Sequence, residues 1–553
     1  MPEPDKGVCS VSDVPLTAPP VIDSAATSLG IELGSTRIKV CLIGEDPSVV
    51  LGVGSHDWEN EFEGRVWTYS LENVWSGIRA AYADLVADVE RRGGERPATF
   101  GAIGISAMMH GYLPFGAADE QLVPFRSWRN TTTGTAAAEL TEAFGVNIPL
   151  RWSIAHLHQA VLDSEQHVGD VRFLTTLAGY VHWKLTGEKV IGVGDASGMF
   201  PIDAQTATYD AELLGRYADL VGSRAPGFDL VDLLPTVLVA GTPAGTLTPE
   251  GAALLDPSGT LQPGAVFCPP EGDAGTGMVA TCSVAPRTGN VSAGTSIFAM
   301  IVLESPLEKL HHEIDLVTTP DGHPVAMVHC NNGASELGAW AGLFVRFAAA
   351  AGLPLSSDAV FETLFREALE GEADAGGLLA FNNLAGEPIT GLDEGRPLVV
   401  RTPDSRLDLG NFMRAQLYAA FATLSLGMRV LASEGVAVDR MFAHGGMFRT
   451  AGVAQRFLAG SLDAPVVVTE TASEGGAWGM AVLASYVGPA ASGVSLDDYL
   501  RTRVFDENQF SQTPADPADV AGFSTYLDRY RAGLAVESAA IENLTHRTTE
   551  QAR

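Results

Sequence analysis

The chain has 553 residues, and its 34 Lys and Arg against 67 Asp and Glu give a formal net charge of −33. Hydrophobic residues make up 46% and charged residues 18%, a balance that supplies large cores and excludes wholesale disorder. Nucleic-acid affinity comes mainly from Lys and Arg neutralising phosphates, so no nucleic-acid partner is expected for so acidic a chain. No apolar run reaches the ~18 residues that a membrane helix needs, so no membrane partner is expected either.

The amino-terminal segment, residues 1–27, is rich in Pro, Ser, Ala and acidic residues. It lacks the basic start and apolar centre of a signal peptide, and we expect a flexible tail. The five cysteines are widely spaced and odd in number, which is typical of neither a disulfide framework nor a zinc site. We expect a cytoplasmic protein.

Strand and helix patterns alternate along the chain, which predicts an α/β fold. An apolar stretch over residues 27–42, interrupted at 34–36, predicts two strands joined by a tight turn. Helical spacing, short apolar runs and turn signals predict the further elements. These are a helix over 70–91, a strand over 102–106, a helix over 173–185 ended by Gly187, a helix over 411–433, a strand over 441–443, a helix over 452–459, a strand over 466–468 and a helix opening near 474.

Two turns in the chain are alike: Gly34-Ser35-Thr36 and Gly294-Thr295-Ser296 each join two apolar strands. The likeness indicates two similar halves that meet near residue 286, with chance as the alternative. Such turns leave backbone N–H groups and hydroxyls facing a concavity, where they can bind phosphate without a net positive protein. A plain β-hairpin is the other interpretation of each turn.

The segment Pro269-Pro270-Glu271-Gly272-Asp273 sets a carboxylate at the start of a small-residue helix. Asp273 fits either a helix N-cap or a general base that accepts a hydroxyl proton in phosphoryl transfer. Both interpretations stay open at this point.

Polar residues also follow the buried strand over 102–106, where Met109 and His110 stand, and they recur at Trp128, Arg129 and Asn130. The carboxyl end of a strand is the usual place for a ligand in an α/β sheet, and an aromatic beside hydrogen-bond donors suits a polyol. A packed loop residue and an ordinary surface turn are the alternatives.

Taken together and in this order, these segments resemble the FGGY family of carbohydrate kinases, over about residues 28–487. Two segments resemble the family's phosphate hairpins, 30–39 and 292–296. Others are similar to its MHG segment (104–111), DASG turn (194–198), GDNAA motif (272–275), LxGER segment (384–387), GGG adenosine turn (444–447) and EaaAlGAA helix (474–479).

The resemblance implies a two-domain, duplicated actin-like or hexokinase-like (ribonuclease H-like) ATPase fold with a cleft between the domains. Residues 28–285 would form the sugar-binding domain, 286–500 the nucleotide-binding domain and 501–553 a C-terminal helical extension.

The resemblance also implies a set of site residues, with Asp273 as the catalytic base. Those expected at the sugar are Met109, His110, Trp128, Asn130, Asp195 and Asp273. Those expected at the nucleotide are Gly34, Ser35, Thr36, Lys39, Gly294, Thr295, Ser296, Gly445, Gly446 and Met447. Glu32 and Asp273 are the candidates for Mg²⁺, although the family usually has Asp at the position of Glu32 and Gln at that of Met108.

The implied reaction transfers the γ-phosphoryl group of MgATP to the 5-hydroxyl of a ketopentose, with D-xylulose the leading acceptor. An L-ribulose kinase of the same family is one alternative. A catalytically silent actin-like sugar sensor is another, from a different class. The expected partners are a small ketopentose and ATP, and a homodimer is the assembly considered.

Overall fold

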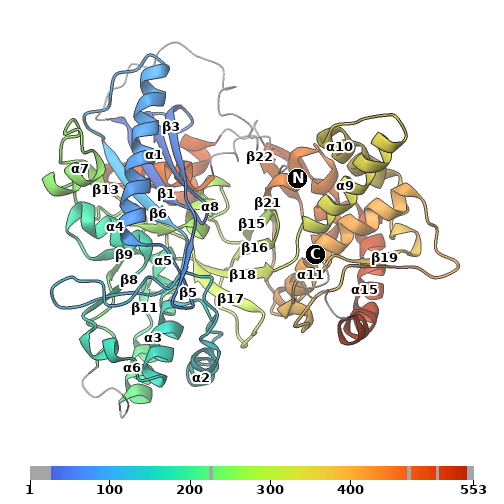
Figure 1. Ribbon diagram of the computed structural model, residues 1–553, viewed down its shortest axis with the longest axis horizontal. Coiled ribbons are helices and arrows are strands. Elements are labelled where there is room, and N and C mark those ends of the chain that lie inside the picture. Colours follow the sequence, from blue (N-terminus) through green and yellow to red (C-terminus); the bar gives the residue numbers. More distant parts are fainter. Residues whose placement is uncertain (1–25, 223, 225–227, 470–474, 506–509, 545–553) are drawn as a thin grey trace.

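The computed structural model describes residues 26–222, 224, 228–469, 475–505 and 510–544. Most of the predicted amino-terminal tail therefore lies outside the described residues. The protein has two lobes side by side, each built on one large sheet with helices packed around it (Figure 1).

The first lobe contains a six-stranded sheet, in which strands run in the order β13-β6-β1-β2-β3 and β14 also pairs with β6. Strands β1, β2 and β3 are antiparallel neighbours, whereas β6 runs parallel to β1. The strands are β1 (Ser28–Leu33), β2 (Arg37–Ile43), β3 (Val50–Asp57), β6 (Ala102–Ala107), β13 (Val266–Phe267) and β14 (Glu271–Gly272).

The second lobe contains a seven-stranded sheet in the order β17-β18-β16-β15-β21-β22-β23. Its central hairpin β15–β16 has an antiparallel strand, β18, on one side and a parallel strand, β21, on the other. Hairpin β1–β2 has β3 and β6 in the same two places, so the duplicated two-lobe fold is confirmed. The strands are β15 (Thr288–Ala293), β16 (Ile297–Val302), β17 (Ile314–Thr318), β18 (Pro324–Cys330), β21 (Arg440–His444), β22 (Val466–Thr469) and β23 (Phe510–Thr513).

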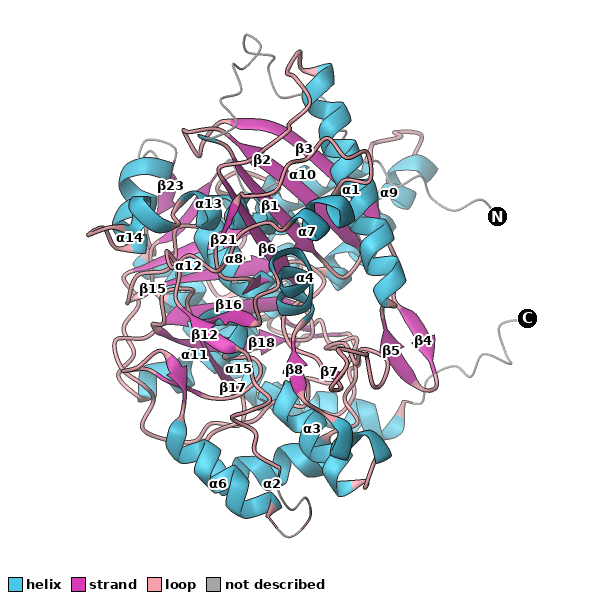
Figure 2. Ribbon diagram, turned by 90° about the vertical axis from the view of Figure 1, so that its left-hand side faces the viewer, coloured by secondary structure: helices cyan, strands magenta, loops and turns pink. Residues whose placement is uncertain are grey.

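Five two-stranded sheets complete the strands, and the β4–β5 hairpin projects from the edge of the molecule below α1 (Figure 2). They are β4–β5 (Glu61–Glu63, Val66–Thr68), β7–β8 (Leu113–Phe115, Phe173–Thr175), β9–β12 (Val190–Gly192, Thr236–Leu238), β10–β11 (Ile202–Asp203, Thr208–Tyr209) and β19–β20 (Leu379–Phe381, Leu398–Val400).

The helices pack around these sheets, with α1 against β3 in the first lobe and α11 against β18 and α12 in the second. They are α1 (Leu71–Arg91), α2 (Gly134–Phe144), α3 (Ser153–Leu162), α4 (Leu177–Thr186), α5 (Val193–Ala196), α6 (Ala211–Val221), α7 (Pro249–Leu255), α8 (Asp273–Ala280), α9 (Ser335–Ala350), α10 (Ser357–Glu367), α11 (Leu409–Ser433), α12 (Val453–Leu462), α13 (Gly475–Ser485), α14 (Leu496–Tyr499) and α15 (Pro517–Asn543).

The predicted helix over 173–185 is wrong at its start. Phe173–Thr175 forms β8, which pairs antiparallel with β7, and the helix begins only at Leu177. The Thr176 hydroxyl caps it by accepting a hydrogen bond from the Gly179 N–H. An apolar run reads the same whether strand or helix, so periodicity missed the boundary. Its predicted end is confirmed, since Gly187 adopts a left-handed conformation after the last turn.

Helix α11 is long and apolar enough to cross a membrane by length and composition, and 72% of its most apolar window is buried. It passes through the core of the second lobe, where its buried residues contact the sheet and α12. A helix buried in the core of a folded domain can be as long and as apolar as a membrane helix, and the burial of α11 is of this kind.

Helix α13 comes from the second half of the chain but packs against β1, β6 and α8 of the first lobe (Figure 2). The approach is so close that a Cβ on Gly30 would lie 2.1 Å from the Ala477 carbonyl oxygen. Gly30 is thus required by the contact between the two halves, because any larger residue in β1 would push α13 away. The first sheet is completed by a helix that lies about 450 residues further along the chain.

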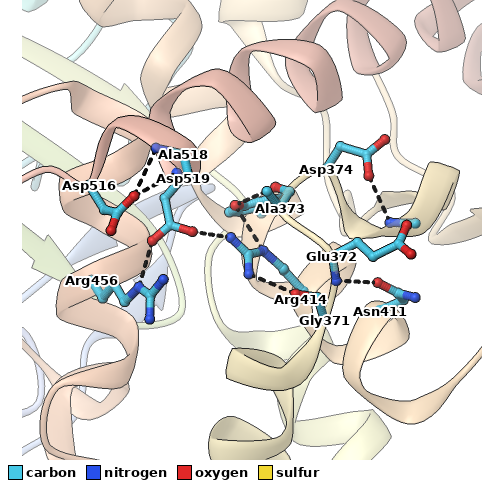
Figure 3. A network of polar contacts seen from close by, with 12 residues as sticks. Gly371, Glu372, Ala373, Asp374, Asn411, Arg414, Arg456, Asp516, Ala518 and Asp519 are labelled. Carbon is cyan, nitrogen blue, oxygen red and sulfur yellow. Dashed lines mark hydrogen bonds and ion pairs between the residues drawn. The ribbon is translucent and has the colours of Figure 1, made fainter.

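The last part of the chain is bound into the second lobe by β23 and by a buried ion-pair network at the start of α15 (Figure 3). The Asp519 carboxylate pairs with Arg414 of α11 through one oxygen and with Arg456 of α12 through the other, the latter at 2.5 Å. Arg414 is further satisfied by the Tyr418 hydroxyl and the Gly371 carbonyl. Because each buried charge has its partners, the network fixes α15 across two helices without leaving an unpaired charge.

Candidate active site

A cavity of about 1280 Å³ is lined by residues of both lobes. Strand and helix ends supply its polar wall: Ser35 follows β1, Ser296 follows β15, and Asp273 begins α8. The residues expected at the sugar or nucleotide that line it are Ser35, Met109, His110, Trp128, Asp273 and Ser296, together with the metal candidate Glu32. Side chains separated by up to 264 positions in sequence thus meet in one cavity.

Asp273 is the first residue of α8, and Gly272 before it has the capping position without any side-chain cap. The Asp273 side chain instead turns to the loop after β6, where its Oδ1 accepts the backbone N–H of Met109 at 3.1 Å. The N-cap interpretation of Asp273 is therefore wrong. The carboxyl group lines the cavity, where solvent reaches it, and the surrounding protein removes part of its water shell.

This enclosure raises the pKa of Asp273 to about 6, and the nearby Glu32 carboxylate adds to the rise. Desolvation disfavours the charged form, so the carboxylate holds a proton more tightly than an exposed one would. A base with a pKa just below neutrality is ionised at pH 7 and still accepts a proton readily.

Two further carboxyl groups lie behind Asp273, and neither lines the cavity. Asp195 is buried in α5, accepts the Thr176 hydroxyl at 2.6 Å through Oδ2, and has no hydrogen-bond partner at Oδ1. Glu271 accepts the N–H groups of Gly194 and Asp195, at 3.2 and 3.0 Å. Burial raises the pKa of both carboxyl groups, and a neighbouring carboxylate adds to each rise, Asp273 for Asp195 and Asp195 for Glu271. Asp195 thus lies behind the cavity wall, and sequence reasoning missed Glu271 beside it.

The side of the cavity predicted to face the sugar, which we call the sugar side, is formed by Met108, Met109 and His110, directly after β6. His110 is buried in a left-handed backbone conformation, φ 74°. Burial and the nearby Arg151 guanidinium keep the pKa of His110 well below its usual range, so the imidazole is neutral. One ring nitrogen, Nδ1, lies 3.5 Å from the Gly198 carbonyl oxygen, which leaves Nε2 of the neutral imidazole for a hydroxyl group.

Asn130, expected at the sugar, is used within the protein and does not line the cavity. Its side-chain oxygen accepts the Trp67 N–H at 2.9 Å, and its amide donates to the carbonyls of Trp67 and Ser127 at 2.8 and 2.9 Å. Trp128 next to it is exposed and does line the cavity.

Each of the two turns predicted to bind phosphate, 34–36 and 294–296, contributes a serine to the cavity wall, and we call them the phosphate turns after that prediction. Each is closed by its glycine N–H, but the accepting carbonyl lies three residues on in the first turn and two residues on in the second. The Gly34 N–H donates to the Arg37 carbonyl at 3.1 Å, and the Gly294 N–H donates to the Ser296 carbonyl at 3.0 Å. Neither glycine has a positive φ. A Cβ on Gly34 would lie 3.0 Å from the Arg37 carbonyl oxygen, so the first turn favours a small residue, whereas a Cβ on Gly294 would meet nothing closer than 3.9 Å. Within the described residues, the amides of Ser35, Thr36 and Thr295 donate no hydrogen bond, which leaves them available to an anion.

The remaining expected nucleotide residues surround these turns without lining the cavity. Lys39 pairs with Glu32 at 3.6 Å. Gly445 has φ 111°, and a Cβ there would lie 2.3 Å from the Ala293 carbonyl oxygen, so the turn after β21 packs directly on the second phosphate turn. Met447 is buried in the core of the second lobe. Of the helix expected near 474, Glu474 lies outside the described residues, whereas Gly475 and Gly476 begin α13 and line the cavity.

Glu32 and Asp273 are the carboxylates available to a divalent cation. Glu32 lines the cavity, and its Oε2 is buried without a hydrogen-bond partner. Across the described ranges, no cluster of three or more His, Cys, Asp or Glu side chains is arranged to hold a metal. Mg²⁺ keeps most of its waters and binds one or two carboxylates plus substrate phosphates, so these two residues fit it better than they fit a tightly caged ion.

Several cavity residues carried no sequence signal. Arg151, in the loop before α3, forms an ion pair with Asp315 of β17, and Asn147 donates to the same carboxylate at 3.0 Å. His329 of β18 lines the same wall. These contacts join positions more than 160 residues apart, and no pattern within one sequence links them.

Comparison with known proteins agrees with this geometry. The model of the "FGGY family of carbohydrate kinases, N-terminal domain" matches residues 27–258, and that of the C-terminal domain matches residues 289–487. No curated protein matched the sequence. The duplicated fold, the cavity between its halves and these two matches define a carbohydrate kinase. The chain belongs to the FGGY family.

Solved structures with the same fold include three kinases that are named after different acceptors. Xylulose kinase from Rhodospirillum rubrum has a TM-score of 0.75 at 20% identity and covers 94% of this chain and 100% of its own. Gluconate kinase from Lactobacillus acidophilus has 0.73 at 15%, covering 94% and 98%. Plasmodium falciparum glycerol kinase with ADP has 0.67 at 14%, covering 94% and 99%. At identities this low, the structural likeness shows that the fold is shared, but it does not show which acceptor this chain uses.

Proposed function

We propose that this sugar kinase phosphorylates the 5-hydroxyl of a ketopentose, with D-xylulose as the leading acceptor and L-ribulose as the second. The carrying observation is that Asp273 and the Met109-His110 segment share one cavity with both phosphate turns. The Asp273 carboxylate is joined directly to that segment through the Met109 N–H. The proposed proton acceptor, Asp273, is therefore linked by a hydrogen bond to the segment that would face the sugar.

In the proposed reaction, ATP lies with its phosphates between the two turns and the sugar lies against His110. The oxygen of the sugar 5-hydroxyl attacks and bonds to the γ-phosphorus, while the Asp273 carboxylate accepts the proton of that hydroxyl. The bond from that phosphorus to the β–γ bridging oxygen breaks, and ADP leaves. The free turn amides would hold the phosphate oxygens, which supplies positioning and charge stabilisation.

Mg²⁺, when bound, would neutralise charge on the ATP phosphates, and Glu32 and Asp273 are the residues that would hold it. The role of Glu32 would be to orient that ion from β1, with Lys39 beside it at 3.6 Å limiting the negative charge of the site.

The neutral His110 supports an uncharged polyol as acceptor. A hydroxyl can both accept from and donate to a neutral imidazole, and a sugar lacking that hydroxyl leaves a buried polar group unpaired. The xylulose kinase fold of the R. rubrum protein supports the same class. D-xylulose and L-ribulose differ in the direction of hydroxyl groups, and both fit this argument.

The test is a coupled ADP-release assay over D-xylulose, L-ribulose, gluconate and glycerol. We expect the two ketopentoses to have the highest kcat/KM, and the 5-phosphate as product. Gluconate or glycerol matching the better ketopentose would overturn the acceptor while leaving the carbohydrate kinase class intact.

A further inference from the structure

Three aromatic side chains from outside the first phosphate turn donate hydrogen bonds to it. The Trp58 indole N–H donates to the Gly34 carbonyl at 2.7 Å. The Tyr69 hydroxyl donates to the Ser35 carbonyl at 2.7 Å, and the Trp128 indole N–H donates to the Ser35 hydroxyl at 3.2 Å. We call Trp58, Tyr69 and Trp128 the aromatic clamp.

The backbone completes this arrangement, because the Trp58 N–H donates to the Thr36 carbonyl at 3.1 Å. Each of the three turn residues thus has its carbonyl oxygen held by the clamp. The amides of Ser35 and Thr36 donate no hydrogen bond within the described residues. Fixing the carbonyls on the clamp side orients the peptide planes, so the free N–H groups are available to an anion.

The clamp is itself held rigidly. The rings of Trp58 and Tyr69 lie with centroids 4.4 Å apart. The β4–β5 hairpin between them is joined to the Trp128 segment through Asn130, which bonds both the N–H and the carbonyl of Trp67. The Arg129 guanidinium lies over the Trp67 ring at 4.6 Å. Asn130 thus gains a role in supporting the clamp.

We propose that Trp58, Tyr69 and Trp128 are positioning residues that hold the first phosphate turn in its anion-binding form. Trp128 has a second contact, since its side chain also lines the cavity on the side of His110. The same indole joins the sugar side of the cavity to the phosphate turn. That the anion is the ATP phosphate rests on the proposed function.

The kinetic test uses Trp58→Phe, Tyr69→Phe and Trp128→Phe, each of which keeps an aromatic ring and removes the donor. The two tryptophan substitutions also remove part of the indole ring. Loss of one hydrogen bond predicts a rise in the KM for ATP of about threefold to tenfold, with the KM for the ketose changed less than twofold. The matched control is Trp75→Phe, whose indole N–H donates to the Tyr180 hydroxyl at 3.0 Å in the same lobe, outside the cavity. A merely structural loss would lower the active fraction and leave both KM values unchanged.

A second measurement does not depend on activity. Amide hydrogen exchange of the peptide covering residues 33–38 should quicken about threefold to tenfold in the clamp variants relative to Trp75→Phe. Unchanged exchange, or an unchanged KM for ATP in all three variants of an active enzyme, overturns the clamp. If the parent protein phosphorylates no sugar, the proposed function fails, and the exchange rates alone decide the clamp.

Discussion

The two phosphate turns occupy equivalent positions in the duplicated fold but are held in different ways. The first is supported by side chains, through the indoles and phenol of the aromatic clamp. The second is supported by backbone, because the Gly333 N–H donates to the Thr295 carbonyl and the Ala334 N–H to the Gly294 carbonyl, both at 2.8 Å. Duplication has thus preserved a turn closed by its glycine N–H, while the acceptor of that hydrogen bond and the supports of the turn have diverged.

The difference follows from what lies next to each turn. The loop after β18 passes directly over the second turn, so that a Cβ on Gly333 would lie 2.5 Å from the Gly294 carbonyl. The segment from Trp58 to Tyr69 reaches the first turn mainly with long side chains, and it adds one backbone hydrogen bond, from the Trp58 N–H to the Thr36 carbonyl. At the second turn, even one added carbon atom on Gly333 would clash with the turn. At the first turn, replacing one aromatic side chain removes one hydrogen bond, the one that this side chain donates.

The largest expected effect comes from replacing the proton acceptor, Asp273, which should lower kcat and leave both phosphate turns able to bind the nucleotide. Asp273→Asn should lower kcat by about 10²–10⁴ while nucleotide affinity stays within about threefold, because removing a general base leaves both turns intact. Steady-state kinetics and ATP titration calorimetry measure the two quantities. The control is Asp210→Asn, at the half-buried N-cap of α6, where Asn caps equally well. Near-parental kcat with saturating sugar would show that Asp273 is not the base.

The backbone support is broken by Gly333→Ala. The added Cβ would meet two carbonyl oxygens of the second turn at 2.5 and 2.9 Å, so the turn must move. Overpacking of this kind costs about 1–3 kcal/mol, which predicts a rise of about fivefold to a hundredfold in the KM for ATP with little change in the KM for the sugar. Gly338→Ala is the control, because nothing lies within 4 Å of its Cβ. Equal effects of both substitutions would argue against a special support at Gly333.

The sugar side should respond independently of both turns. His110→Asn should raise the KM for the ketose about fivefold to tenfold, through loss of one hydrogen bond worth about 1–1.5 kcal/mol, and leave the KM for ATP unchanged. Asn suits this site because it tolerates the positive φ of His110 better than Ala. His323→Asn, outside the cavity, is the control. A change confined to the ATP parameter would contradict a sugar role for His110.

The smallest expected effect is in the pH dependence. With the pKa of Asp273 at about 6, kcat/KM of the free enzyme should fall to about half at pH 6 and about tenfold per unit below it. The folded pKa is above the usual value of 3.8, so the ionised carboxylate opposes folding, and this cost grows as the pH rises from about 4 through 6. Asp273→Asn should therefore raise Tm at pH 7 and not at pH 4. An acid limb near pH 4 in the rate profile would contradict the raised pKa.

Local patterns in the sequence were enough to locate the elements that form the two hairpins and their turns. Gly34-Ser35-Thr36 and Gly294-Thr295-Ser296 identified themselves by residue type between apolar runs, and the helix predicted over 411–433 agrees with α11. These features depend on near neighbours in the chain, so hydrophobic periodicity and turn chemistry suffice to find them. The order of such segments also sufficed for the family.

Contacts between residues far apart in the sequence were decided by the tertiary structure alone. Whether Asp273 caps its helix or faces the cavity depended on the Met109 N–H, 164 positions earlier. The partners of Asn130, the pairing of Arg151 with Asp315, and the packing of α13 under β1 were equally out of reach. A side chain's chemistry can be read from its type, but its pKa, its partners and its access to solvent are set by whatever the fold brings within a few ångströms of it.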